Sequence, residues 1–336
     1  MRNADKFVRA AAIAAFFATC TSAVAAEKIS IMVGGLEKQI YLPFKLTERL
    51  GYFKDEGLDV ELLSQPSGVE AENEMLAGAV QGVGGFYDHC LDLQAKGKFV
   101  VSIVQINQTP GEVELVSTKH PEIKSPADFK GKSLGVTGLG SSTNFLTQYM
   151  AVKNGLKLGE FSTIPVGAGT TFIAALQQDK IQAGMTTEPT VSRLLKTGEA
   201  KVLVDLRSPE STKAALGGLY PATALYMPAP WIEAHKAEAQ KLANALVKTL
   251  RFIQSHSAAE ITEKMPADYY AGDKEGYIKA LTDGKVMFTP DGIMPDKGPE
   301  TVYAVLSAFS KNLQNTKINL AQTYTTEFVK NVQVSN

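Results

Sequence analysis

Cysteine is scarce in this chain of 336 residues, which contains only Cys20 and Cys90. Cys20 lies in an N-terminal segment that we expect to be cleaved, so a single cysteine would remain. An exported chain with one cysteine has no internal disulfide, and its stability must come from a hydrophobic core. The chain beyond residue 26 is long enough for such a core and suggests two domains.

Neither sign of charge is in excess. The chain has 34 basic and 35 acidic residues, which is a net charge of −1. Residues 1–26 hold three of the basic residues and one acidic residue, so the net charge of the rest is −3. Nucleic-acid binding is excluded on this basis, because it needs a basic surface.

Arginine is rare in the part of the chain that we expect to remain. After residue 26 it is limited to four positions, which are Arg49, Arg193, Arg207 and Arg251. None of them falls in the glycine-rich loops that come after the expected strands. A bidentate clamp from arginine to an acid group is therefore not expected, and neutral donors would hold an anion instead.

The sequence patterns of common catalytic and cofactor sites are missing. There is no Gly-x-Ser-x-Gly, no Gly-x-x-x-x-Gly-Lys and no His-Glu-x-x-His pattern, so enzymes of those classes have no support. His89 and Cys90 are adjacent, but neighbouring residues on a helix do not face one another. A metal site needs several converging ligands, and no other His or Cys is near in sequence. We expect no catalytic residue, no metal and no cofactor.

Long hydrophobic runs are also missing, apart from a short one near the N-terminus. Residues 10–18 are apolar, come after basic residues, and precede small residues of the Ala-x-Ala type at 23–26. This pattern is typical of a secretory signal peptide, here residues 1–26, and the run is too short to span a bilayer. A lipid anchor on Cys20 is the alternative, but Thr19 is large for that cleavage position. We expect a soluble periplasmic protein without a membrane anchor.

Short apolar runs alternate with helical patterns along the rest of the chain. We predict strands at 29–33, 58–63, 79–83, 99–105, 115–117, 133–136, 162–166, 183–185, 202–204 and 222–226. We predict helices that include 41–50, 69–76, 86–93, 171–178, 190–196 and a long helical run at 233–255. Such alternation is typical of mostly parallel sheets with helices on both faces.

The order of these elements predicts an α/β fold with two lobes. The first lobe would contain residues 27–115 and 223–336, and the second would contain residues 116–222. Ligands of open α/β sheets bind beyond the carboxyl ends of the strands. In two facing lobes, that place is the cleft between them.

The loop at residues 138–144 is the most informative stretch for ligand binding. It reads Gly-Leu-Gly-Ser-Ser-Thr-Asn and stands where a helix is expected to begin. The first N–H groups of a helix have no internal partner, and the helix dipole is positive there. Glycines allow close approach and hydroxyls add donors, so the loop is suited to an anion. The alternative is an ordinary N-cap by Ser141 or Ser142.

Four stretches of the chain match a known pattern. They are 46–60 (LTERLGYFKDEGLDV), 126–136 (PADFKGKSLGV), the loop around 140–142, and 174–184 (AALQQDKIQAG). In these stretches the chain resembles the periplasmic substrate-binding proteins of ABC importers, of the nitrate/sulfonate/taurine type. The resemblance runs from about residue 28 to about residue 310. Asp179 and Gln182 depart from the common Gly and Asp of the last stretch, at positions that concern the fold.

The resemblance implies a periplasmic-binding-protein-like fold of type II. It also implies that the lobes close on a small organic anion, and that an ABC transporter permease is the partner. We predict ligand contacts from loops that come after strands, at Gln39, Tyr41, Gly85, Phe86, Tyr87, Gly140, Ser141, Ser142, Thr143, Thr170, Thr187, Glu188 and Tyr220.

Several of these residues have an ordinary structural explanation as well. The aromatic residues would form an apolar wall of the pocket, but core packing is the alternative for each of them, and it explains Phe86 equally well. Glu188 in an anion pocket would repel the ligand unless the ligand carries an amino or hydroxyl group. The alternative for Glu188 is an acid in the first turn of a helix, where the dipole favours it.

These inferences predict a monomeric periplasmic solute-binding protein rather than an enzyme. Its ligand would be a sulfonate, a carboxylate or a related acid. Two alternatives stay open from the sequence. One is an exported or relict enzyme related to the thiamine-pyrimidine precursor synthases, and the other is a solute sensor module.

Overall fold

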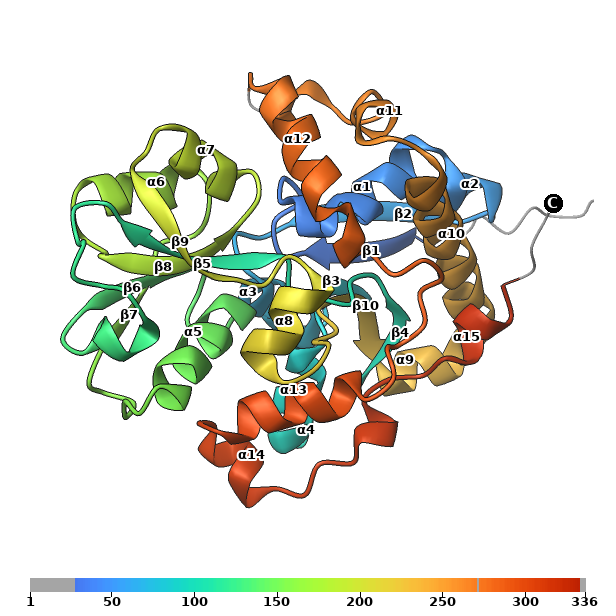
Figure 1. Cartoon of the computed structure of the whole chain (residues 1–336). Helices are drawn as coiled ribbons and strands as arrows, with labels where there is room; N and C mark the ends of the chain where they lie inside the picture. The colour runs from blue at the N-terminus through green and yellow to red at the C-terminus, as the bar shows by residue number, and fades with distance from the viewer. Residues whose placement is uncertain (1–27, 271, 333–336) are drawn as a thin grey trace, which may run out of the picture.

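Two five-stranded sheets organise the molecule (Figure 1). A computed structural model describes residues 28–270 and 272–332. The predicted signal peptide, residues 1–26, lies outside the described residues. Lobe 1 is the part of the molecule built on the first sheet, and lobe 2 is the part built on the second.

The first sheet has the strand order β2-β1-β3-β10-β4. Its strands are β1 (Lys28–Val33), β2 (Asp59–Ser64), β3 (Gly82–Phe86), β4 (Val100–Gln105) and β10 (Thr223–Pro228). Strand β1 runs parallel to β2 and β3, whereas β10 is antiparallel to both β3 and β4.

The second sheet has the order β7-β6-β8-β5-β9. Its strands are β5 (Glu112–Ser117), β6 (Ser133–Val136), β7 (Ser162–Pro165), β8 (Ala183–Thr187) and β9 (Ala200–Asp205). Strand β6 is parallel to β7 and β8, and β5 is antiparallel to β8 and β9. The second sheet therefore repeats the arrangement of the first.

Both sheets are mixed, but in each of them only one strand runs against the others, so the expectation of mostly parallel sheets is confirmed. The antiparallel members, β5 and β10, are the first strands after each passage of the chain between the lobes. Each of these two strands begins at the edge of the sheet where the other strands end, so it runs in the opposite direction to them. Strand β5 already belongs to the second sheet from Glu112 onward, a few residues before the boundary expected after residue 115. The division of the chain into domains otherwise stays a prediction.

Helices cover both faces of each sheet. In lobe 1 they are α1 (Leu42–Arg49), α2 (Tyr52–Asp55), α3 (Gly68–Leu76), α4 (Asp88–Ala95), α9 (Ala229–Ala234), α10 (Lys236–Ser255), α11 (Ala258–Thr262), α12 (Lys274–Gly284), α13 (Gly298–Ser307), α14 (Lys311–Asn315) and α15 (Glu327–Lys330). In lobe 2 they are α5 (Ser142–Lys153), α6 (Thr170–Gln177) and α7 (Thr190–Lys196), and α8 (Pro209–Leu216) lies on the return passage. Short 3-10 turns occur at Gln39–Tyr41, Pro126–Phe129, Ala267–Tyr270, Lys285–Met287 and Leu320–Gln322.

Two of the helix predictions were wrong in part, one at its start and the other because the helix is interrupted. Phe86 was expected to start a helix, but it is the last residue of β3, and α4 begins at Asp88. The run expected at 233–255 is divided, because α9 ends at Ala234 and α10 begins at Lys236. None of the helices within residues 28–270 and 272–332 combines the length and the apolar character that crossing a membrane requires.

The hydrophobic core does not stop at the boundary between the lobes. One buried cluster combines residues of β3, α4 and α13 in lobe 1 with residues of α5 in lobe 2. Phe145 of α5 and Phe309, which comes just after α13, have ring centroids 6.1 Å apart. Helix α5 is therefore packed against lobe 1, and its first residues lie at the junction of the lobes.

The two segments of chain that connect the lobes form backbone hydrogen bonds with each other. The N–H of Asn107 donates to the carbonyl oxygen of Thr223 at 3.0 Å, and the N–H of Ala222 donates to the carbonyl oxygen of Asn107 at 3.0 Å. Further on, the N–H of Gly111 donates to the carbonyl oxygen of Leu206 at 3.0 Å. These paired segments are the place where a change in angle between the lobes would be absorbed.

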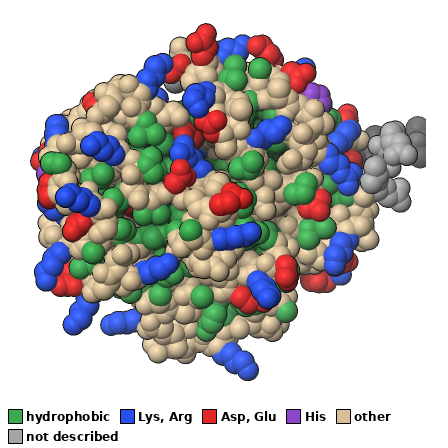
Figure 2. All heavy atoms as spheres, in the orientation of Figure 1, with side chains coloured by type: hydrophobic (Ala, Val, Ile, Leu, Met, Phe, Trp, Pro, Cys, Tyr) green, Lys and Arg blue, Asp and Glu red, His purple; other side chains and the backbone are tan. Residues whose placement is uncertain are grey.

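The visible surface has no dominant charge. Figure 2 shows Lys and Arg interspersed with Asp and Glu over the whole face drawn. This distribution agrees with the nearly neutral composition, and it offers no continuous basic surface on this face for nucleic acid.

Candidate functional site

The cleft between the lobes is closed in this structure, and polar contacts cross it. The backbone N–H of Gln39 donates to the carbonyl oxygen of Glu188 at 3.1 Å. The hydroxyl of Ser142 donates to Oδ1 of Asp88 at 2.9 Å. Both pairs join lobe 1 to lobe 2, so closure brings the ends of several loops together.

A small polar cavity of about 10 Å³ lies at this junction. That is room for about one water molecule, so this cavity admits only a compact group unless the lobes move apart. Lobe 1 contributes Gly34, Lys38, Ile40, Tyr41 and Gly68 to its wall, and lobe 2 contributes Glu112, Thr137, Ser141, Ser142, Thr143 and Thr187.

The N-terminus of α5 forms one wall of the cavity. Ser141 stands at the N-cap position, but its side chain does not cap the helix. Its hydroxyl donates to the carbonyl oxygen of Gly138 at 2.7 Å and lies 2.8 Å from Oγ1 of Thr143. The ordinary N-cap considered from the sequence is therefore not formed at Ser141. The first N–H groups of α5 keep their capacity to bind an anion.

A second helix N-terminus meets the cavity from lobe 1. Helix α3 begins at Gly68, which lines the cavity, and the side chain of Ser67 does not cap it. The Ser67 hydroxyl donates to Oε2 of Glu70 instead, at 3.1 Å. Two positive helix ends from opposite lobes thus converge on one small space, which favours a negative group.

Lys38 adds a full positive charge to the site. Only 4 % of it is exposed, and its Nζ donates to the carbonyl oxygens of Gly34 at 2.6 Å and of Pro66 at 2.7 Å. An ammonium group has three protons, so one donor remains beyond these two bonds. Burial lowers the pKa of Lys38, and the nearby carboxylates of Glu37, Glu112 and Glu70 oppose that shift.

Glu112 places a carboxyl group in the same cavity. Only 2 % of it is exposed, and its Oε2 has no hydrogen-bond partner among the described residues. Burial raises the pKa of Glu112 well above its usual range, and Asp88 raises it further, while Lys38 opposes the shift. The site is therefore rich in donors on most sides and has one buried carboxyl group without a partner.

The structure brings five of the predicted ligand-binding residues to this cavity. They are Tyr41, Ser141, Ser142, Thr143 and Thr187. They come from three separate loops and from both lobes. Whether they contact a ligand stays a prediction.

The other predicted residues have different surroundings. The Gln39 amide donates to the carbonyl oxygen of Tyr277, Phe86 packs edge-on against Tyr41, and the Tyr87 hydroxyl bonds to Thr323. Gly85 lies against Tyr226 in the sheet, and the N–H of Gly140 donates to Asn144. Thr170 is exposed at the start of α6.

Tyr220 and Asp88 form a buried pair behind the cavity. The Tyr220 hydroxyl donates to Oδ2 of Asp88 at 2.8 Å, while Ser142 binds the other oxygen. Both oxygens of Asp88 are therefore satisfied within the protein.

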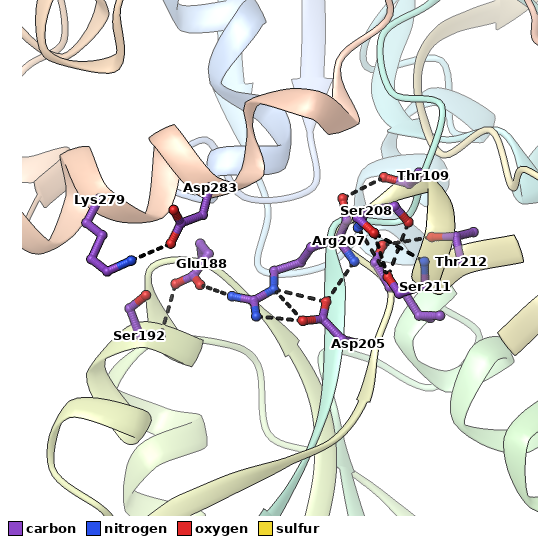
Figure 3. Close-up of polar contacts among 11 residues, drawn as sticks. Thr109, Glu188, Ser192, Asp205, Arg207, Ser208, Ser211, Thr212, Lys279 and Asp283 are labelled. Carbon is purple, nitrogen blue, oxygen red and sulfur yellow. Dashed lines mark hydrogen bonds and ion pairs between the residues drawn. The ribbon is translucent and has the colours of Figure 1, made fainter. Parts of the chain in front are cut away.

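Glu188 is held by protein groups and does not line the cavity. Its Oε1 lies 3.0 Å from Nη1 of Arg207, and its Oε2 accepts the N–H of Ser192 at 2.9 Å. Figure 3 shows the Arg207 guanidinium between Glu188 and Asp205. Nη2 of Arg207 lies 2.6 Å from Oδ2 of Asp205. The bond to Ser192 places the Glu188 carboxylate at the N-terminal end of α7, which is close to the structural alternative considered from the sequence.

Sequence reasoning missed several residues of the wall. Gly34, Lys38 and Ile40 belong to a loop that was expected to face the cleft, but they were not selected. Gly68, Glu112 and Thr137 were not considered. Glu112 and Glu114 alternate with apolar residues in a fully buried strand, and this pattern of acids in a buried strand is the signal that could have found Glu112.

His89 is paired with an acid rather than with other metal-ligating groups. Its Nδ1 lies 2.8 Å from Oε2 of Glu72, and both side chains are buried. Burial alone lowers the pKa of His89, but the Glu72 carboxylate outweighs it and raises the pKa to about 9. Within the described part of the chain, no three His, Cys, Asp or Glu side chains gather as a metal site.

Two mixed α/β lobes that close over a cavity at facing helix ends define a binding protein of the periplasmic type II fold. The sequence pattern described as NMT1/THI5 like matches residues 41–259. This match spans more than half of the chain, and the protein belongs to that family.

Similar proteins support the assignment of the fold. A solved structure of a protein from Bordetella bronchiseptica RB50 is 37% identical, with a TM-score of 0.88 over 91% of this chain and 96% of that one. The alkanesulfonate-binding protein SsuA of Xanthomonas axonopodis pv. citri, solved with MOPS bound, is 17% identical, with a TM-score of 0.71 over 89% and 98%. YtlA of Bacillus subtilis (strain 168), described as a putative binding protein, is 22% identical over 273 residues, or 79% of each chain.

Proposed function

We propose that this protein is the solute-binding component of an ABC importer and that it captures a small organic anion between its two lobes. The observation that carries the proposal is the convergence of two uncapped helix N-termini and the buried ammonium of Lys38 on one cavity at the closed cleft. These groups favour a negative ligand without an arginine clamp.

The mechanism that we propose is closure driven by the ligand. An anion would bind first to the N–H groups of α5, and the contacts of lobe 1 would form as the cleft closes. Binding energy then shifts an equilibrium between open and closed forms. The closed form would be the one presented to the permease of the importer, and the protein would act as a monomer in the periplasm.

The neighbours also bear on the choice between transport and catalysis. SsuA and YtlA are described as binding proteins, and this favours a binding role over the enzyme alternative. In the cavity, Lys38 is engaged by two carbonyl oxygens, and nearby His89 is engaged by Glu72. Neither is presented as a free base or nucleophile, and we propose that the protein is not an enzyme.

A thermal-shift screen against small sulfonates, carboxylates and nitrate tests the proposal. A ligand at 100 times its Kd stabilises the folded protein by about 2.7 kcal/mol, which is readily detected. Calorimetry would then compare the wild type with a Ser142→Ala/Thr143→Ala double variant. We expect the double variant to fold and to bind the best anion at least tenfold more weakly.

Lys196→Ala is a suitable control, because Lys196 forms an exposed ion pair with Asp273 across the cleft and lies outside the cavity. Its affinity should remain within about twofold of the wild type. Equal affinities of the double variant and the wild type would contradict an anion site at the start of α5.

A further inference from the structure

A simple anion bound in the cavity would not account for the presence of the Glu112 carboxyl group. It is the first residue of β5, it is 2 % exposed, and its Oε2 has no hydrogen-bond partner in the part of the chain that the structure describes. Lys38 does not supply one, because its Nζ is directed to the carbonyl oxygens of Gly34 and Pro66. A buried oxygen without a partner is costly, typically by about 1–3 kcal/mol.

The rest of the cavity offers mainly donors. The ends of α3 and α5 and the side chain of Lys38 surround the same space. A simple anion would satisfy these donors but would bring no hydrogen-bond donor to Oε2 of Glu112. A ligand with an acid group at one end and a donor at the other would satisfy both sides of the cavity, once the lobes have moved apart enough to admit it.

We propose that the solute is a compact acid that also carries a hydroxyl or amino group, and that Glu112 accepts a hydrogen bond from this group. The inference rests on the proposed function and narrows its ligand class. The acid group would lie against the first N–H groups of α5. Glu112 would thus have the selective role that the sequence suggested for Glu188, whose carboxylate is instead bound by Arg207.

Glu114 provides a matched comparison on the same strand. It lies two residues further along β5, on the same face, and is fully buried, but it does not line the cavity. Its Oε2 accepts the hydroxyl hydrogen of Thr147 at 2.8 Å, while its Oε1 has no hydrogen-bond partner among the described residues. Substitution at Glu114 therefore perturbs a buried acid of β5 without removing an acceptor from the cavity.

Pairs of acids that differ only in the donor test the inference. Calorimetry would compare glycolate with acetate, β-alanine with propionate, and taurine with ethanesulfonate. We expect the wild type to prefer the member with the donor by at least tenfold in any pair that binds, because an analogue without the donor leaves Glu112 unpaired.

Variants at Glu112 test whether this residue causes the preference for the acid with the donor. Glu112→Leu should remove the preference, and binding of the acid without the donor should become tighter. Glu112→Gln keeps an acceptor oxygen but cannot become a carboxylate, so it should retain preference for a hydroxyl and lose it for an ammonium group. Glu114→Leu should keep the wild-type preference. Circular dichroism of each variant checks that it folds.

Three outcomes would overturn the inference. If both members of every binding pair bind equally to the wild type, Glu112 does not select a donor, although the proposed function stands. If Glu112→Leu and Glu112→Gln both keep the wild-type preference for hydroxyl and for ammonium groups, Glu112 does not select a donor, although the proposed function stands. If no acid of any pair shifts the melting temperature but another anion of the screen does, this inference fails and the proposed function stands, whereas both fail if no anion of the screen shifts it.

Discussion

The hydroxyl of Ser142 donates a hydrogen bond to Oδ1 of Asp88 at 2.9 Å across the boundary between the lobes. Ser142 is the first residue of α5, and Asp88 is the first residue of α4. The loop that the sequence singled out therefore contributes to the closed contact as well as to the cavity. A ligand at this helix end and the closure of the cleft are coupled through one side chain.

Loss of this hydrogen bond should favour the open form. We expect Ser142→Ala to increase the radius of gyration of the protein with its best anion bound, measured by small-angle X-ray scattering. The bond is worth about 1–3 kcal/mol, so a population that is mostly closed would become mixed. Lys196→Ala should change the radius much less, because an exposed pair contributes at most about 1 kcal/mol. Identical curves for Ser142→Ala and the wild type would contradict this role.

A methyl group at Gly138 should prevent full closure. A Cβ atom there would lie 2.6 Å from Oγ and 3.0 Å from Cβ of Ser67 on the other lobe. Gly138 has no positive φ, so alanine strains the contact between the lobes rather than the backbone. We expect Gly138→Ala to bind its best anion at least tenfold more weakly in calorimetry, with little change in melting temperature.

The double variant Gly138→Ala/Ser67→Gly tests whether the steric contact with Ser67 causes the loss of affinity. Removal of the Ser67 side chain makes room for the new methyl group and should restore most of the affinity. An affinity that stays low in the double variant would mean that Gly138 acts in some other way.

His89 should make the stability depend on pH above neutrality. Its folded pKa of about 9 lies above the ordinary value of 6.5, so the folded state binds a proton more tightly than the unfolded state. This contribution is complete below pH 6.5 and is lost as the pH rises through about 9. The shift corresponds to about 3 kcal/mol at most. Urea unfolding between about pH 6 and about pH 10 should show a falling free energy of unfolding.

Glu72→Gln is the matched variant, because it removes the carboxylate that keeps His89 protonated. Its free energy of unfolding should be lower than that of the wild type at the acidic end of this range and should change much less towards the alkaline end. A decline in Glu72→Gln that is as steep as in the wild type would assign the pH dependence to other groups.

The variant Glu188→Gln should show whether Glu188 stabilises the fold or contacts the ligand. It would weaken the contact of 3.0 Å to Arg207 while it leaves room for the bond from Ser192. We expect the free energy of unfolding to fall by about 1–2 kcal/mol, and affinity for the best anion to stay within about twofold. A large loss of affinity with unchanged stability would instead support the sequence prediction that Glu188 contacts the ligand.

The α/β character and the general place of the site were accessible from sequence because they depend on local patterns. Alternating apolar runs and helical periodicity indicate strands and helices without knowledge of their partners. Glycines and hydroxyls before a helix likewise indicate a helix start at 138–144, and α5 does begin at Ser142. Strand β3 was placed too early, because Gly82 and Gly84–Gly85 conceal a fully buried strand that is mostly glycine.

The direction of β5 and β10 was not accessible in the same way. A strand has the same apolar pattern whether its neighbours are parallel or antiparallel, so the mixed sheets appear only when the passages between the lobes are known. The division of α9 from α10 at His235 was also missed, because the periodicity continues across it.

By itself, the sequence determined the class of fold, the absence of common catalytic motifs and the helix end that faces the cleft. Each of these is a matter of composition or of neighbours along the chain. The tertiary structure alone decided that Lys38 and Glu112 share one cavity while Glu188 is bound by Arg207. A carboxylate acquires its role from the groups that packing places against it. Those groups come from other loops and from the opposite lobe, and no local pattern records them.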